Sequence, residues 1–175
     1  MKKLLSFLLV LAVCLSLGAC DLDTAPPKET ASSTDQTNQE TETKDENFGL
    51  NETAVFESLK FTATELKESK GTEFFKPESG NVFVGVKFNI ENVSDEEQSV
   101  STMLLFEGYV DDVKCDYSIN ASCAFDEGTL DGSIAPGKKM TGWYALEVSK
   151  DWSNLEMHVS ASWLSGSSAK FVFTK

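Results

Sequence analysis

The segment 81–91, NVFVGVKFNIE, constrains the fold most strongly, because its apolar side chains recur at every second position. From Val82 to Ile90 every even-numbered residue is valine, phenylalanine or isoleucine. Successive side chains of a strand point to opposite faces, whereas those of a helix repeat about every 3.6 residues. The pattern therefore predicts a β-strand with one face against a core.

Further short apolar segments follow one another, with turn residues between them. Asp111-Asp112 is one predicted turn, and 135–138 (APGK) is another, because proline fixes φ and glycine adopts positive φ easily. The other predicted strands are 54–66, 102–110, 113–119, 140–148, 155–161 and 169–174. We expect 102–110, apolar on both faces, to be a central strand, and only 150–154 to form a helical turn. About seven to eight strands predict an all-β fold, an immunoglobulin-like antiparallel β-sandwich.

Residues 1–19 have the layout of a secretory signal peptide. Lys2 and Lys3 precede an apolar run over 4–17, which is shorter than the roughly 20 residues that span a bilayer. The run ends in Leu17-Gly18-Ala19-Cys20, which resembles the bacterial lipobox. This resemblance implies cleavage before Cys20, a diacylglycerol on its sulfur, and attachment to the cell membrane with the chain facing outward. The alternative is an ordinary signal peptide with a chance cysteine.

The composition changes after this motif and again at Phe48. Residues 20–47 are polar and acidic, so they bury too little surface to offset the entropy of ordering. We expect them to form a disordered linker and 48–175 to form one domain. The chain has 28 acidic residues and no arginine, and its net charge of −13 excludes nucleic acid as a partner. Anionic headgroups repel this charge too, so attachment to the membrane rests on the acyl chains.

Two cysteines remain once Cys14 leaves with the signal peptide and Cys20 is lipidated. Cys115 and Cys123 form an even pair in an exported domain, where oxidation is permitted. We expect them to form a disulfide that closes a short loop. The alternative is two free thiols.

Nothing in the sequence matches a common catalytic motif. His158 is the only histidine, and its position between Met157 and Val159 in an alternating segment predicts that it faces solvent. A cysteine–histidine dyad would require His158 to lie beside Cys115 or Cys123. We expect the protein not to be an enzyme and to carry no cofactor.

Acidic residues cluster between positions 111 and 131. Calcium binds six to eight oxygens from such flexible carboxylates, but the spacing does not match an EF-hand. Solvated turn carboxylates are the simpler interpretation, so we assign no metal site. The cluster consists of Asp111, Asp112, Asp116, Asp126, Glu127 and Asp131.

Aromatic residues in predicted loops are candidates for partner contact. Phe74 and Phe75 lie in one loop, Trp152 in another, and Trp163 beside a serine–glycine run. Exposed aromatic side chains are common anchors of interfaces. The alternative is that they close the ends of the sandwich.

Two motifs resemble a family of lipoprotein domains. The first is Phe75-Lys76-Pro77-x-x-Gly80, which leads into the strand that ends at Asn92. The second is GSIAPGKKMTGWY at 132–144, followed by EVSKDW at 147–152, although the family usually has proline where this chain has Ser149. The resemblance covers about residues 53–174. It implies an immunoglobulin-like domain of unknown function, found mainly on Gram-positive surfaces, and the pair of cysteines lies outside its pattern.

Together these features predict a lipid-anchored extracellular β-sandwich that acts as a protein-interaction module at the cell surface. Its partners would be the membrane, through Cys20, and an unidentified extracellular protein or small ligand. The alternative is a non-adhesive envelope protein that assists an exported complex or binds a small ligand or calcium. An importer's solute receptor is excluded, because such proteins need two α/β lobes.

Overall fold

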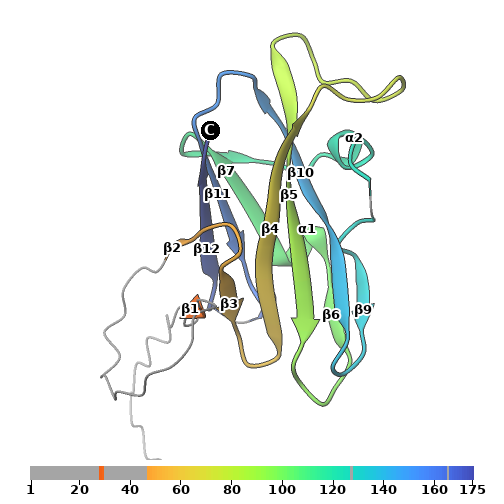
Figure 1. The fold of residues 1–175 in the computed structure, drawn as a ribbon, viewed down its shortest axis with the longest axis vertical. Coiled ribbons are helices and arrows are strands. Elements are labelled where there is room, and N and C mark those ends of the chain that lie inside the picture. Colours follow the sequence, from red (N-terminus) through yellow and green to blue (C-terminus); the bar gives the residue numbers. More distant parts are fainter. Residues whose placement is uncertain (1–27, 30–46, 127, 165) are drawn as a thin grey trace, which may run out of the picture.

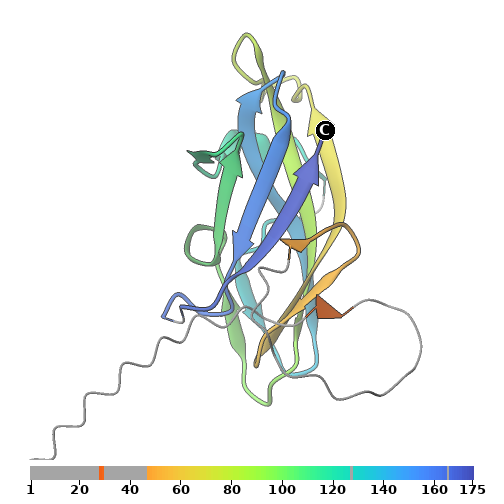
Figure 2. The ribbon, with the colours of Figure 1, turned by 90° about the vertical axis from the view of Figure 1, so that its left-hand side faces the viewer.

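The computed structural model describes residues 28–29, 47–126, 128–164 and 166–175. The signal peptide, the lipidation of Cys20 and most of the predicted linker lie outside these residues. Within them, two five-stranded sheets pack face to face, and a small two-stranded sheet lies at one end (Figure 1, Figure 2). The structure therefore confirms an all-β sandwich.

The first sheet is built around β5, the strand predicted from the alternating pattern. Its order is β1 (Lys28–Glu29), β3 (Thr53–Val55), β4 (Leu59–Ser69), β5 (Asn81–Asn92) and β10 (Lys139–Ser149). All neighbours are antiparallel, and β5 pairs with β10 from Asn81 opposite Ser149 to Glu91 opposite Lys139. The short strand β1 shows that part of the predicted linker pairs with the sheet edge.

The second sheet packs against the first and carries the C-terminal strands. Its order is β2 (Asn47–Phe48), β12 (Ala169–Thr174), β11 (Asn154–Val159), β7 (Phe106–Val110) and β8 (Val113–Cys115). Strand β2 runs parallel to β12, and the other neighbours are antiparallel. The small sheet pairs β6 (Gln98–Val100) with β9 (Gly132–Ile134). Two helical turns complete the fold: α1 (Thr102–Leu105) and α2 (Ile119–Ser122).

The main core fills the space between the two large sheets and is rich in aromatic rings. Phe88 from β5 meets Phe106 from β7 and Phe171 from β12, with ring centroids 5.3 Å apart in both pairs. A second, smaller cluster lies on the outer face of the first sheet, where Phe125 stacks on Trp143. Because α2 and the chain after it cover this face, Phe83 is buried even though the alternation points it away from the main core.

Three predicted elements differ in the structure. Segment 54–66 contains two strands, because the Phe56 N–H donates to the Leu59 carbonyl (2.9 Å) in a tight turn between them. Segment 102–110 begins as α1, and β7 lies beside the edge strand β8 rather than in the centre of its sheet. Segment 150–154 forms a turn instead of a helix. The twelve strands of the described residues exceed the predicted number, since six have only two or three residues.

No helix in the described part of the chain is long and apolar enough to cross a membrane.

Candidate functional site

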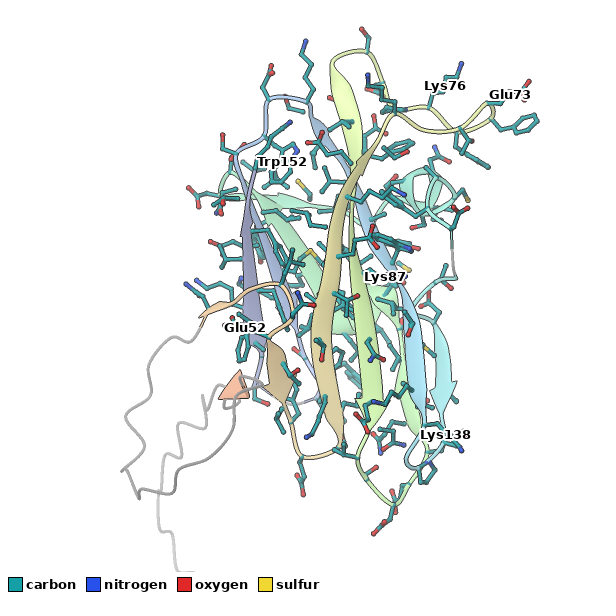
Figure 3. The ribbon with its side chains drawn as sticks, in the orientation of Figure 1. Glu52, Glu73, Lys76, Lys87, Lys138 and Trp152 are labelled. Atoms are coloured by element: carbon teal, nitrogen blue, oxygen red, sulfur yellow. The ribbon has the colours of Figure 1, made fainter. Side chains whose placement is uncertain are left out.

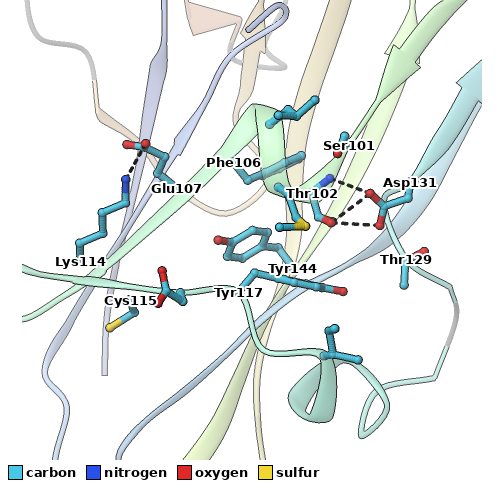
Figure 4. A pocket seen from close by; sticks show the side chains of 14 residues that line it. Ser101, Thr102, Phe106, Glu107, Lys114, Cys115, Tyr117, Thr129, Asp131 and Tyr144 are labelled. Carbon is cyan, nitrogen blue, oxygen red and sulfur yellow. Dashed lines mark hydrogen bonds and ion pairs between the residues drawn. The ribbon is translucent and has the colours of Figure 1, made fainter.

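A cavity of about 700 Å³ opens where the edges of the two large sheets meet. Strands β7 and β8 form one wall, β10 forms the back, and α1 and the segment before α2 form the sides (Figure 4). Its lining residues are Ser101, Thr102, Met103, Leu104, Phe106, Glu107, Lys114, Cys115, Asp116, Tyr117, Ile119, Thr129, Asp131 and Tyr144. They come from segments far apart in the sequence, so only the fold brings them together.

The rim of the cavity is apolar and open to solvent. Met103 is 80% exposed, Leu104 62% and Ile119 71%. Three large aliphatic side chains around one opening are unusual on a soluble surface, where such contiguous patches mark interaction sites. We call these three residues the aliphatic rim.

A contact between the carboxylate of Asp131 and the buried Thr102 holds one side of this rim in place. The Asp131 carboxylate accepts hydrogen bonds from the Thr102 N–H (2.9 Å) and the Thr102 hydroxyl (3.0 Å). Thr102 is buried and begins α1, so Asp131 fixes the turn that displays Met103 and Leu104 (Figure 4).

Aromatic rings form the floor of the cavity. Phe106 stacks on Tyr144 with centroids 5.4 Å apart, and Tyr117 lies 5.3 Å from Tyr144 on its other side (Figure 4). We call these three residues the aromatic floor. The Tyr117 hydroxyl accepts a hydrogen bond from the Ser122 hydroxyl (2.7 Å), which ties the floor to α2.

Tyr144 carries the most informative polar atom of the cavity. The residue is only 3% exposed, yet its hydroxyl has no hydrogen-bond partner among the described residues and points into the cavity (Figure 4). Burial raises the pKa of Tyr144, and the negative charges of Asp116 and Glu107 raise it further. The hydroxyl therefore stays protonated and is available to a ligand as donor and acceptor.

Charged groups surround the cavity on the side of β7 and β8. Lys114 donates to Glu107 (2.7 Å), which holds the pKa of the Glu107 carboxyl below its usual range and raises that of Lys114. Asp116 is exposed and has no hydrogen bond or ion pair within the described chain. Carboxylates thus outnumber the single lysine around the opening.

The predicted disulfide is wrong, because Cys115 and Cys123 are both free thiols. Cys115 packs against the main core and lines the cavity, whereas Cys123 is exposed at the end of α2 on the outer face of the first sheet. Between them the chain crosses the edge of β10, where the Ser118 N–H donates to the Ala145 carbonyl (3.0 Å). Burial raises the pKa of the Cys115 thiol, which keeps it mostly protonated and slows its reactions.

A second hollow of about 250 Å³ adjoins the cavity. Leu104 and Glu107 line both, and the second hollow adds His158 and the exposed Trp163. His158 lies on the outer face of β11, half-buried against Glu156 and the Tyr109 ring, and not in a dyad with a cysteine.

The aromatic residues predicted as partner contacts do not lie at the cavity. Phe74 is 84% exposed and Phe75 partly exposed, in the loop marked by Glu73 and Lys76, which projects from the sandwich (Figure 3). The structure corrects the prediction for Trp152, which is 3% exposed and closes one end of the core (Figure 3). Its indole N–H donates to Glu68 (2.7 Å), so Trp152 closes the end of the sandwich instead of offering a contact to a partner.

The acidic cluster is dispersed by the fold. Asp111 accepts hydrogen bonds from the backbone N–H groups of Ser153 and Asn154, and Asp131 is engaged with Thr102. Across the described ranges no group of three or more side chains is arranged to hold a metal ion, and Glu127 lies outside them.

Sequence reasoning missed the cavity and its central residue. The alternation of β10 places Tyr144 on the core side, but nothing local indicates that this position opens to solvent between two sheet edges. The available signal was the apolar character of both faces of 102–105, which fits a short helix with an exposed side as well as a strand.

Comparison with known proteins gives the family. Residues 48–170 match the sequence model of a family described as Domain of unknown function (DUF4352). The chain belongs to this family. The match covers nearly all of the sandwich, including every residue that lines the cavity. No curated protein matches the chain.

Solved structures with a similar fold come from Bacillus and Clostridium species. The "putative lipoprotein (ycdA)" of Bacillus subtilis strain 168 has a TM-score of 0.57 at 15% identity, over 70% of this chain and 38% of that one. The chain therefore spans well under half of ycdA. An uncharacterized β-sandwich protein of Clostridium difficile 630 has a TM-score of 0.50 at 16% identity, over 78% of this chain and 99% of that one. A conserved hypothetical protein of Bacillus anthracis has a TM-score of 0.50 at 16% identity, over 65% of this chain and 88% of that one. At these identities the similarity shows the fold alone.

Proposed function

We propose that this DUF4352 protein is a lipid-anchored extracellular binding module, and that it holds an apolar segment of another protein in the cavity between β7, β8 and β10. The observation that carries the proposal is the combination of an aliphatic rim with an unpartnered Tyr144 hydroxyl at the bottom. The anchor is the acyl group expected on Cys20, in agreement with the lipoprotein description of ycdA.

The dimensions and lining of the cavity support binding. Ligand pockets typically measure about 300–1,000 Å³ and combine apolar walls with a few polar groups that fix orientation. The cavity of about 700 Å³ lies within that range, with the aromatic floor as its walls and the Tyr144 hydroxyl as such a polar group. Burying the aliphatic rim under a partner would remove solvent from three large side chains, each worth about 1.5–3 kcal/mol when fully buried.

The titratable groups of the cavity support binding rather than catalysis. A thiol, phenol or amine that acts as a nucleophile needs a pKa close to the working pH or below it. Burial raises the pKa of both the Cys115 thiol and the Tyr144 hydroxyl, so both remain protonated at neutral pH. Lys114 is held protonated by Glu107. We infer that the protein is not an enzyme.

A protein partner fits the surface better than an isolated small molecule because the apolar surface extends beyond the cavity. Leu104 is shared with the second hollow, where Trp163 is 68% exposed. A small ligand that fills the cavity is the second candidate, favoured by the enclosed position of the Tyr144 hydroxyl.

Site-specific photo-crosslinking on intact cells separates these candidates. The photoreactive amino acid p-benzoylphenylalanine would replace Met103 on the aliphatic rim, with Lys67, exposed on β4, as the control position. We expect a protein adduct from position 103 and none from position 67. No adduct from position 103 in a chain displayed at normal levels would refute a protein partner, and an adduct only from position 74 would place the binding face on the β4–β5 loop.

A further inference from the structure

The aromatic floor and the carboxylates together form a site for a positively charged group. Phe106, Tyr144 and Tyr117 form a continuous row of rings, and Tyr117, the partly exposed ring at its end, is the one whose π-electron density can attract a cation. Glu107 and Asp131 lie on opposite sides of this row (Figure 4), and Asp116 lines the same cavity. An aromatic surface flanked by carboxylates is complementary to an ammonium or guanidinium group.

The only basic residue among those that line the cavity does not neutralise this site. Lys114 is engaged with Glu107 at 2.7 Å, and its ammonium also lies 6.0 Å from the Tyr109 ring outside the cavity. Asp116 has no hydrogen bond or ion pair within the described chain, and Lys114 interacts with it only at a distance, so its carboxylate oxygens are open to a ligand. The Tyr144 hydroxyl, which has no hydrogen-bond partner in the described chain although its residue is only 3% exposed, offers acceptor lone pairs at the bottom of the same space.

We propose that the side chain entering this cavity is an arginine or lysine of the partner protein, and that apolar residues on either side of it pack on the aliphatic rim. The inference rests on the proposed function, because it names the chemistry of the segment that the module binds. The inserted group donates to the Tyr144 hydroxyl and to Asp116, and its alkyl stem lies against Tyr117, the partly exposed ring of the aromatic floor. The net charge of −13 attracts such a basic segment from a distance.

Binding of two matched peptides tests the charge. Acetyl-Gly-Leu-Arg-Leu-Gly-amide and its citrulline counterpart have nearly the same shape, but citrulline is neutral. Each would carry a neutral fluorophore and be titrated with the full chain, purified with its lipid in a maltoside detergent, while fluorescence anisotropy is measured. We expect the arginine peptide to bind about five- to tenfold more tightly, the sum of a cation–π contact and one partly exposed ion pair.

Three substitutions and a change of salt concentration test whether that preference arises in the cavity. Asp116→Asn should reduce the ratio of the two affinities to about two, while Asp95→Asn, an equal change of charge in the β5–β6 loop, should leave it unchanged. Tyr144→Phe keeps the ring and should weaken both peptides, because the hydroxyl accepts from either side chain. Raising the salt from about 0.1 M to about 1 M shortens the Debye length from about 10 Å to about 3 Å and should weaken only the arginine peptide.

The outcomes distinguish this inference from the proposed function. Equal affinities for the two peptides, both reduced by Met103→Ser, would overturn the cationic side chain and leave the binding module intact. A preference for arginine that Asp116→Asn and Asp95→Asn reduce alike would also overturn it, because the effect would then come from the net charge alone. If neither peptide binds, the cationic side chain is refuted, and the crosslinking from position 103 decides the proposed function independently.

Discussion

Replacing Asp131 with alanine tests how the rim of the cavity is held. Its carboxylate is the acceptor for the N–H and the hydroxyl of Thr102, at 2.9 and 3.0 Å. Thr102 is one of two buried polar residues within the described ranges, and it starts α1. In Asp131→Ala both buried donors lose their acceptor, and α1 loses the contact that fixes it to the start of β9.

The magnitude follows from these two hydrogen bonds. A hydrogen bond to a charged group contributes about 1.5–3 kcal/mol, and a position open to water on one side belongs at the lower end. We therefore expect Asp131→Ala to lower the free energy of unfolding by about 2–3 kcal/mol. For a domain of this size, that corresponds to a fall in Tm of about 6–12 °C. Asp131→Asn keeps one acceptor oxygen and should cost about 1 kcal/mol.

Urea unfolding of the full chain, followed by tryptophan fluorescence, measures the effect. The double variant Thr102→Val/Asp131→Ala completes a mutant cycle, and we expect the two changes to be strongly non-additive because they remove the same contact. Loss of less than about 0.5 kcal/mol in Asp131→Ala, the range of an ordinary surface substitution, would refute the reasoning.

Other regions of the fold give further predictions. Lys175 holds the pKa of the Glu68 carboxyl below its usual 4.5. The stability that this interaction contributes is therefore present at neutral pH and lost as the pH falls below about 4.5. Glu68→Gln lacks this contribution, so its Tm should fall less than that of the native protein between neutral pH and about pH 3. Gly142→Ala should lower the free energy of unfolding by about 1–3 kcal/mol, because the added Cβ would lie 2.9–3.0 Å from facing backbone atoms. An unchanged midpoint of urea unfolding would contradict that packing. Mass spectrometry should show that both Cys115 and Cys123 are alkylated without prior reduction, and that Cys123 reacts faster. If alkylation required a reductant, the two cysteines would form a disulfide after all.

The sequence predicts the strands whose side chains alternate, because a period of two is a local property. Strand β5 is the clearest case, and β10 and β12 also lie within one residue of the predicted ranges. The burial of Phe83 on the outer face was not predictable, since it depends on α2 docking there from nearly forty residues further along the chain.

The candidate site was much less predictable than the fold. The helical turn at Thr102 depends on Asp131, a residue 29 positions away. The cavity depends on two sheet edges that meet without closing, so that Tyr144 is core-facing yet accessible at its hydroxyl. The loop aromatics that the sequence favoured are either in the β4–β5 loop, like Phe74, or buried, like Trp152.

The two thiols provide the most direct test of the claim that the cavity holds a partner. Cys115 lines the cavity, whereas Cys123 lies outside it on α2 and serves as an internal control. The measurement is the ratio of their alkylation rates in intact cells, where the partner is present, and in the purified chain. We predict that Cys115 is protected several-fold relative to Cys123 in cells. The same ratio in both settings would contradict an occupied cavity.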